Sequence, residues 1–206
     1  AWENDPRVNL VNGQGLPAAP FRTDTGPIRP KIRVACIGDS ITAGTGLEHP
    51  RVTAYPARLR ELLGPDYAVR NFGRAGAGAV RRSMRGTQKR AYSFASQHAA
   101  ALAWQPDIVV SNLGINDVMD WERFGRSDFV ADYCSLVADY RALPSEPRIL
   151  LWTPLAPLFD GHHFHGDPLL DEIDAAIAEV ARLDSLETVN LHAPLAENPE
   201  WFAVDM

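Results

Sequence analysis

The chain has 206 residues, of which 46% are apolar and 22% charged, and its formal net charge is −6 at pH 7. These values indicate one globular domain with a sizeable core. The negative charge argues against nucleic acid as a partner, and no apolar run reaches the roughly 18 to 20 residues that a membrane-spanning helix needs. The chain begins at Ala1 without an initiator methionine, which fits a mature secreted or periplasmic form or a shortened chain.

Residues 1–30 contain five prolines and no sustained periodicity, which predicts an extended N-terminal arm before a domain of residues 31–206. In that domain, apolar runs typical of strands alternate with helical patterns. Strands are expected at 31–37, 66–72, 107–113, 148–153 and 187–191, and helices near 53–63, 90–104, 127–143 and 168–183. This alternation predicts a parallel sheet covered by helices on both faces.

Polar, glycine-containing sequences follow or end three of these strands, at the edge where a doubly wound sheet gathers its ligand site. They are Gly38-Asp39-Ser40, Asn71-Phe72-Gly73-Arg74 and Gly114-Ile115-Asn116-Asp117. A serine at a strand-to-helix turn can attack a carbonyl carbon, and the resulting oxyanion needs preorganised donors. We expect these donors to be the Gly73 N–H and the Asn116 amide, with Asp39 and Asp117 as supporting hydrogen-bonders.

In this order, the three sequences resemble those of the SGNH (GDSL-type) hydrolases, a family of esterases and lipases. The resemblance runs from about Lys31 to the end of the chain. It implies that Ser40 is the nucleophile and that the oxyanion hole consists of the Ser40 and Gly73 N–H groups with the Asn116 side chain. It also implies a three-layer α/β/α, flavodoxin-like doubly wound sheet of order 2-1-3-4-5, and no required metal or organic cofactor.

The fourth sequence of this family, Asp-x-x-His, supplies the general base and the carboxylate that orients it. An apolar stretch leads into Asp205, so the resemblance gives Asp205 the orienting role. The histidine would stand three positions later, beyond Met206, and we expect it and a closing helix to follow in a longer chain. His192 is the alternative base after the fifth strand, although it lacks the family spacing.

Other titratable residues suggest contacts with the substrate. A histidine cluster at 162–165 follows the fourth strand, and we assign His163 to substrate binding rather than to a metal site. Arg74, beside the expected oxyanion hole, is the second substrate-binding candidate. His49 and His98 are assigned to the surface.

Five cations fall within ten residues of this otherwise acidic chain: Arg81, Arg82, Arg85, Lys89 and Arg90. The run is either a solvated surface segment or a site that recognises an anionic substrate such as an acidic sugar. The sequence alone leaves both interpretations open.

The sequence therefore predicts a serine esterase that removes an acetyl group from a carbohydrate through an acyl-enzyme. Aromatic residues near the third and fourth strands suggest a polar, aromatic-lined pocket: Trp121, Phe124, Trp152 and Phe159. A loose similarity to sialate O-acetylesterase-type enzymes favours the same substrate. The alternatives are a lysophospholipase or thioesterase of the same family, or a non-catalytic carbohydrate-binding protein. The expected partner is a small-molecule or carbohydrate ester, with neither nucleic acid nor a membrane span.

Overall fold

The computed structural model of the chain describes residues 31–85, 88–154, 158–159, 162–163 and 168–191. The chain divides into two units, Ala1–Pro30 and Lys31–Met206, and the structure described below belongs to the second unit. The extended arm predicted for residues 1–30 lies outside the described residues.

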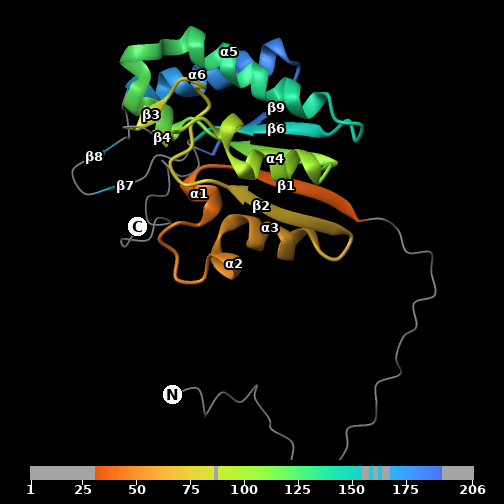
Figure 1. The fold of residues 1–206 in the computed structure, drawn as a ribbon. Helices are drawn as coiled ribbons and strands as arrows, with labels where there is room; N and C mark the ends of the chain where they lie inside the picture. Colours follow the sequence, from red (N-terminus) through yellow and green to blue (C-terminus); the bar gives the residue numbers. More distant parts are fainter. Residues whose placement is uncertain (1–30, 86–87, 155–157, 160–161, 164–167, 192–206) are drawn as a thin grey trace, which may run out of the picture. The chain divides into compact units, whose positions relative to one another are not determined.

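Five parallel strands form one sheet in the spatial order β2-β1-β5-β6-β9 (Figure 1). They are β1 (Ile32–Gly38), β2 (Tyr67–Gly73), β5 (Ile108–Asn112), β6 (Arg148–Trp152) and β9 (Glu187–Val189). Counted along the chain, this is the order 2-1-3-4-5, so the predicted doubly wound α/β fold and its strand order are confirmed. The side chains of β1 are buried from Val34 onward, as expected of a central parallel strand covered on both faces.

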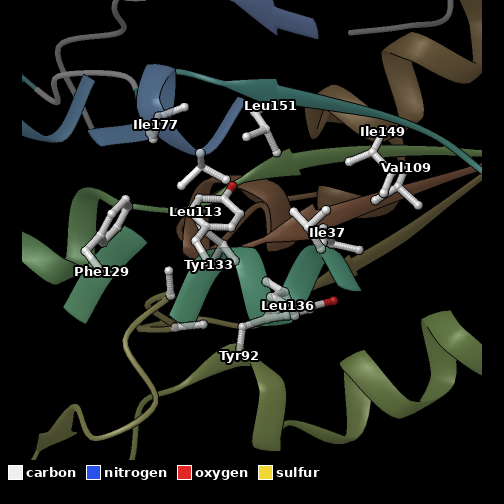
Figure 2. Close-up of a cluster of buried hydrophobic side chains, with 14 of the residues drawn as sticks. Ile37, Tyr92, Val109, Leu113, Phe129, Tyr133, Leu136, Ile149, Leu151 and Ile177 are labelled. Atoms are coloured by element: carbon white, nitrogen blue, oxygen red, sulfur yellow. The ribbon is translucent and has the colours of Figure 1, made fainter. Parts of the chain in front are cut away.

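Helices α4 (Ser96–Ala103), α5 (Trp121–Arg141) and α6 (Pro168–Leu183) contribute to the main core on one face of the sheet. Figure 2 shows part of this core, in which strand residues meet helix residues: Ile37, Val109, Ile149 and Leu151 with Tyr133, Leu136 and Ile177. Helix α3 (Tyr55–Leu63) packs Leu59 and Leu63 against a smaller core on the other face. Both faces of the sheet therefore bury apolar side chains.

Helix α4 begins at Ser96, six residues later than predicted. The preceding residues are used in another way, because Ala91 forms a β-bridge with Gly78. The hydroxyl of buried Tyr92 donates a hydrogen bond to the carbonyl oxygen of Phe72 at 2.7 Å. The apolar residues of this segment thus fix it beside the end of β2 instead of extending a helix.

Helix α5 begins at Trp121, earlier than predicted, and is interrupted at Gly125, whose φ of 64° and ψ of −174° are not helical. Several short elements were not predicted: α1 (Ser40–Ala43), α2 (Pro50–Thr53), β3 (Met84–Arg85), β4 (Gln88–Lys89), β7 (Leu158–Phe159) and β8 (His162–His163). Among the helices of the described ranges, none combines the length and apolarity needed to cross a membrane.

Candidate active site

Ser40 is the first residue of α1, directly after the turn that follows β1. Asp39 caps this helix, since its Oδ1 accepts a hydrogen bond from the Ile41 N–H at 2.9 Å. Gly38 has no room for a side chain, because a Cβ there would overlap Thr42 Oγ1 and the carbonyl oxygen of Asn112. The sharp turn therefore needs glycine, and it leaves the Ser40 side chain half-buried at the edge of the sheet.

The sequences that begin at Gly38, Asn71 and Gly114 were predicted to meet at one edge of the sheet, and the strand register agrees with this. Gly38 in β1 stands opposite Gly73 in β2 and opposite Asn112 in β5. The residues that follow these three positions must therefore share the edge at the carboxyl ends of the strands. This register places Ser40 between the segment after Gly73 and the segment that carries Asn116.

The Gly73 N–H is already engaged in the structure. It donates a hydrogen bond to Asn71 Oδ1 at 2.8 Å, and Asn71 Nδ2 donates to the Thr42 carbonyl oxygen at 2.6 Å. A Cβ on Gly73 would also overlap the backbone nitrogen of Ala43. Gly73 thus lets the end of β2 approach α1 closely, and its predicted role as an oxyanion donor would require the bond to Asn71 to open.

Gly76 offers a second backbone N–H in the same loop. It occupies the left-handed region with φ of 73°, inside a turn closed by the hydrogen bond from the Ala77 N–H to the Arg74 carbonyl at 3.1 Å. The Gly76 carbonyl accepts from Arg90 Nε at 3.2 Å, whereas the Gly76 N–H makes no hydrogen bond within the described part of the chain. The sequence analysis missed this position, although its glycine lies only three residues after Gly73.

Asn116 lies against this loop, as the strand-end positions predict. Its Nδ2 donates a hydrogen bond to the Ala77 carbonyl oxygen at 3.0 Å. An amide nitrogen carries two hydrogens, so one N–H remains for a further acceptor. The structure therefore brings the Asn116 amide together with the turn at Gly76.

Two buried carboxyl groups support the edge beneath these loops. Asp117 accepts from the Ala79 N–H at 2.9 Å and from the Val80 N–H at 3.0 Å, and burial raises its pKa to about 6. Burial likewise raises the pKa of Asp39 to about 7, with the charge of Asp117 adding to the effect. The predicted hydrogen-bonding role of both residues is confirmed. Their contacts go to backbone N–H groups around the site.

The basic run at 81–90 is not a free cationic surface in its described part. Arg90 is only 7% exposed, and it donates through Nη2 to the Asn116 carbonyl at 3.1 Å in addition to its bond with Gly76. Arg81 Nη1 donates to Ser135 Oγ at 2.7 Å, and Arg82 pairs with Asp128 at 2.5 Å. Arg90 therefore contradicts the solvated interpretation, whereas the exposed side chain of Arg82 fits it. The side chains of Arg85 and Lys89 lie outside the described set, so the anion-binding interpretation stays a prediction.

The aromatic residues proposed to line a pocket make mostly internal contacts. Trp121 is buried and its ring centroid lies 5.5 Å from that of Phe129, while Trp152 lies 5.1 Å from Tyr55. Phe124 lies beneath the guanidinium groups of two arginines. These contacts do not support the expected polar, aromatic-lined pocket at Trp121, and the side chain of Phe159 lies outside the described residues.

Of the remaining predicted site residues, the structure describes the side chain of only one. Arg74 is half-buried and its Nη1 donates to the Ala91 carbonyl at 3.4 Å, beside the turn at Gly76. His163 falls in β8, and its side chain is outside the described set, as is the whole of Asp205. Within the described ranges, no group of three or more His, Cys, Asp or Glu side chains is arranged to hold a metal ion.

His49 is exposed as predicted, but His98 is not. The His98 ring is buried, with Nδ1 3.2 Å from the Tyr140 hydroxyl and Nε2 3.1 Å from an Asp139 carboxylate oxygen. Burial lowers the pKa of His98 despite the neighbouring carboxylate. It is a core residue of α4 that packs against Tyr140 of α5.

Comparisons with known proteins identify the family and the fold of the chain. A curated acetylxylan esterase from Xylanibacter ruminicola is 33% identical over 186 residues, which cover 81% of this chain and 37% of that protein. The chain thus spans little more than a third of that relative. A solved carbohydrate acetylesterase from Sinorhizobium meliloti shares the fold with a TM-score of 0.61 at 20% identity, over 78% of this chain and 84% of its own.

A solved acetyl xylan esterase has a TM-score of 0.59 at 21% identity, over 82% of this chain and 84% of its own. At such identities the two solved structures establish the fold alone. The family assignment comes from the sequence, because residues 36–206 match the GDSL-like lipase/acylhydrolase family. The chain therefore belongs to the GDSL-like lipase/acylhydrolase family, a family of carboxylic ester hydrolases.

Proposed function

We propose that this protein hydrolyses an ester through an acyl-enzyme, with Ser40 as the nucleophile. The observation that carries the proposal is the shared level of Gly38, Gly73 and Asn112, from which the loops with Ser40 and Asn116 leave the sheet. A nucleophile and a neutral amide donor at one sheet edge are the elements that acyl transfer requires.

Three donors are proposed to stabilise the oxyanion. The first two are the Ser40 N–H at the start of α1 and the remaining N–H of the Asn116 amide. The third is an N–H of the loop after β2, and we place it at Gly76, since the Gly73 N–H is bonded to Asn71 Oδ1. Preorganised donors of this kind typically contribute about 10²- to 10³-fold each to kcat.

In the proposed reaction, Ser40 Oγ bonds to the carbonyl carbon of the ester while its proton passes to a histidine base. The alcohol then leaves with that proton, and water hydrolyses the acyl-enzyme to release the acid and regenerate Ser40. Asp205 is proposed to orient the histidine. Arg74, beside the turn at Gly76, and His163 are proposed to contact the substrate.

For the substrate, we propose an acetyl ester on a carbohydrate. The support is the relative named as an acetylxylan esterase, since it is 33% identical to this chain. The internal packing of Trp121 and Trp152 removes the argument from an aromatic pocket. A series of nitrophenyl esters should therefore fall steeply in kcat/KM beyond butyrate, and an optimum at about eight or more carbons would indicate a lipase instead.

The nucleophile is tested in the full-length protein with Ser40→Ala. Hydrolysis of nitrophenyl acetate should fall by about 10⁴-fold or more, with little change in Tm. Ser96→Ala is the matched control, because Ser96 is also the first residue of a helix but is exposed at the start of α4. Comparable activity in Ser40→Ala and Ser96→Ala would exclude Ser40 as the nucleophile.

A further inference from the structure

A groove of about 470 Å³ runs beside the edge strand β2, between it and helices α2 and α3. Figure 1 shows these two helices next to β2, with α1 close by. The lining residues are Ala43, Pro50, Arg51, Pro56, Ala57, Arg60, Val69, Arg70 and Asn71. Three of them are arginines and none is acidic, although the chain as a whole is acidic. The volume falls in the usual range of small-molecule sites, about 300–1,000 Å³.

The charge of this groove is not neutralised by the protein in its described part. Seven arginines of the described part have a carboxylate partner: Arg33, Arg58, Arg82, Arg90, Arg126, Arg141 and Arg148. Arg51, Arg60 and Arg70 have none within the described ranges, although Glu61 lies next to Arg60 in the sequence. That carboxylate pairs instead with Arg58 at 2.9 Å. The arginines of the groove therefore remain available to bind an external anion.

Arg70 lines the groove, but its guanidinium points to the other face of the sheet. Its guanidinium carbon lies 4.8 Å from the centre of the Trp104 ring, which packs with Phe72 against the main core, whereas Val69 faces α3. The guanidinium groups available to a ligand in the groove are therefore those of Arg51 and Arg60. A guanidinium presents parallel N–H groups that match the two oxygens of a carboxylate. Arg51 and Arg60 thus offer the groove donors suited to a planar anion.

One end of the groove is lined by two residues that are close to the proposed active site. Asn71 and Ala43 line it, and both contact the residues around Gly73, where Asn71 accepts from the Gly73 N–H. Ala43 belongs to the same short helix as Ser40. A carbohydrate long enough to place its ester at Ser40 could therefore extend along β2 into the groove.

We propose that this groove binds a carboxylate-bearing sugar of an acetylated carbohydrate, at a position remote from the acetyl ester. The inference rests on the proposed function for the nature of the substrate. Because Arg51 and Arg60 are exposed, each contact is weak and screened by salt, and recognition depends on their combination. Neutral carbohydrates would bind without the contribution of the arginine–carboxylate contacts.

The test compares acetylated xylo-oligosaccharides with and without a glucuronic acid branch. In the double variant Arg51→Gln/Arg60→Gln, the ratio of kcat/KM for the acidic substrate to that for the neutral one should fall about tenfold. This fall should shrink in about 0.5 M salt. Arg182→Gln is the control. Arg182 is exposed, has no ion pair among the described residues and lines a different hollow, so the ratio should not change in this variant. An unchanged ratio in the double variant, or an equal fall in the control, would overturn the proposal.

Calorimetry with the deacetylated, glucuronate-bearing oligosaccharide separates this inference from the proposed function. Binding to the wild type that weakens in the double variant supports the groove even if no acetyl ester is hydrolysed. Hydrolysis without such binding overturns the groove and leaves the esterase intact. Inorganic phosphate serves as the competing anion: if it binds in the groove and the glucuronate does not, the carboxylate assignment is wrong.

Discussion

The buried guanidinium of Arg90 donates a hydrogen bond to the carbonyl oxygen of Asn116 at 3.1 Å. The same group donates to the Gly76 carbonyl at 3.2 Å and lies 3.7 Å from the Asp120 carboxylate. One side chain therefore connects the loop after β2 with the loop after β5. These are the two loops that carry the proposed oxyanion donors at Gly76 and Asn116, so the buried Arg90 side chain links the two donor positions.

Replacing Arg90 tests this positioning role. Arg90→Lys keeps the charge near Asp120 but has a single nitrogen, which cannot reproduce the planar fork that reaches both carbonyls. The donors would shift relative to Ser40, and we expect kcat for nitrophenyl acetate to fall about 10- to 100-fold with little change in KM. Steady-state kinetics with a parallel Tm measurement check this.

Arg148→Lys provides the control for Arg90→Lys. Arg148 is exposed at the start of β6, where it pairs with Glu187, and this is the end of the sheet opposite the site. Its replacement should leave both kcat and KM unchanged. If Arg90→Lys lowers Tm alone and kcat stays at the wild-type value, Arg90 has a structural role only.

Asn116→Ala should remove one oxyanion donor. Because the proposed hydrogen bond forms mainly in the transition state, kcat should fall by about 10²- to 10³-fold while KM moves little. The bond from Asn116 Nδ2 to the Ala77 carbonyl is lost as well, so Tm should be recorded beside the kinetics. A change confined to KM would mean that Asn116 binds the ground-state substrate instead.

The fold could be predicted because its signals are local. The strands are short apolar runs bounded by polar or glycine residues, and each predicted strand was found within two residues at either end. Helix α6 was predicted at 168–183 and spans Pro168–Leu183, since proline suits its first turn and one face is apolar. The start of α4 was missed because Tyr92 makes its contacts with a residue 20 positions away.

Site residues could be predicted from the sequence only where they follow the end of a strand. Ser40 and Asn116 follow strands directly, and the topology brings their segments together. The role of Arg90 depends on carbonyl groups 14 and 26 positions away, which no local pattern reveals. The choice between Gly73 and Gly76 likewise depends on which N–H the Asn71 side chain occupies, and that contact is visible only in the folded chain.

Gly78 should be intolerant of a side chain for a specific reason. A Cβ there would lie 2.5 Å from Asp117 Oδ1 and 2.9 Å from its Cγ. Gly78→Ala should therefore lower the free energy of unfolding by about 1–3 kcal/mol. In an Asp117→Ala background, the same substitution should cost much less, because the obstructing carboxylate is gone.

Denaturant unfolding of the wild type, the two single variants and the double variant measures this coupling. The Asp117→Ala variant is itself expected to be destabilised, since the Ala79 and Val80 N–H groups lose their acceptor. Strictly additive losses would show that Gly78 is required for a reason other than the approach of Asp117.

Asp39 should make the stability of the protein depend on pH. Its pKa is raised from 3.8 to about 7 in the folded chain, chiefly by burial. Between these two values the folded state binds more protons than the unfolded state, so the free energy of unfolding must fall as the pH rises. Asn at position 39 does not titrate and still caps α1, because asparagine and aspartate are comparable caps. Relative to Asp39→Asn, the wild type should therefore lose on the order of a few kcal/mol between about pH 4 and pH 7.

Urea unfolding of both proteins at about pH 4, 5.5 and 7 measures the difference, and Asp117 titrates in both, so its contribution largely cancels. Arg33 and Asp107 offer a contrasting pair at the opposite end of β1, where the guanidinium lowers the pKa of the Asp107 carboxyl. Asp107→Asn should show the reverse sign, with the wild type gaining stability relative to the variant as the pH rises through the acid range. A wild-type advantage over Asp39→Asn that grows from pH 4 to pH 7 would mean that the Asp39 carboxylate is stabilised by the helix N-terminus more than it is penalised by burial.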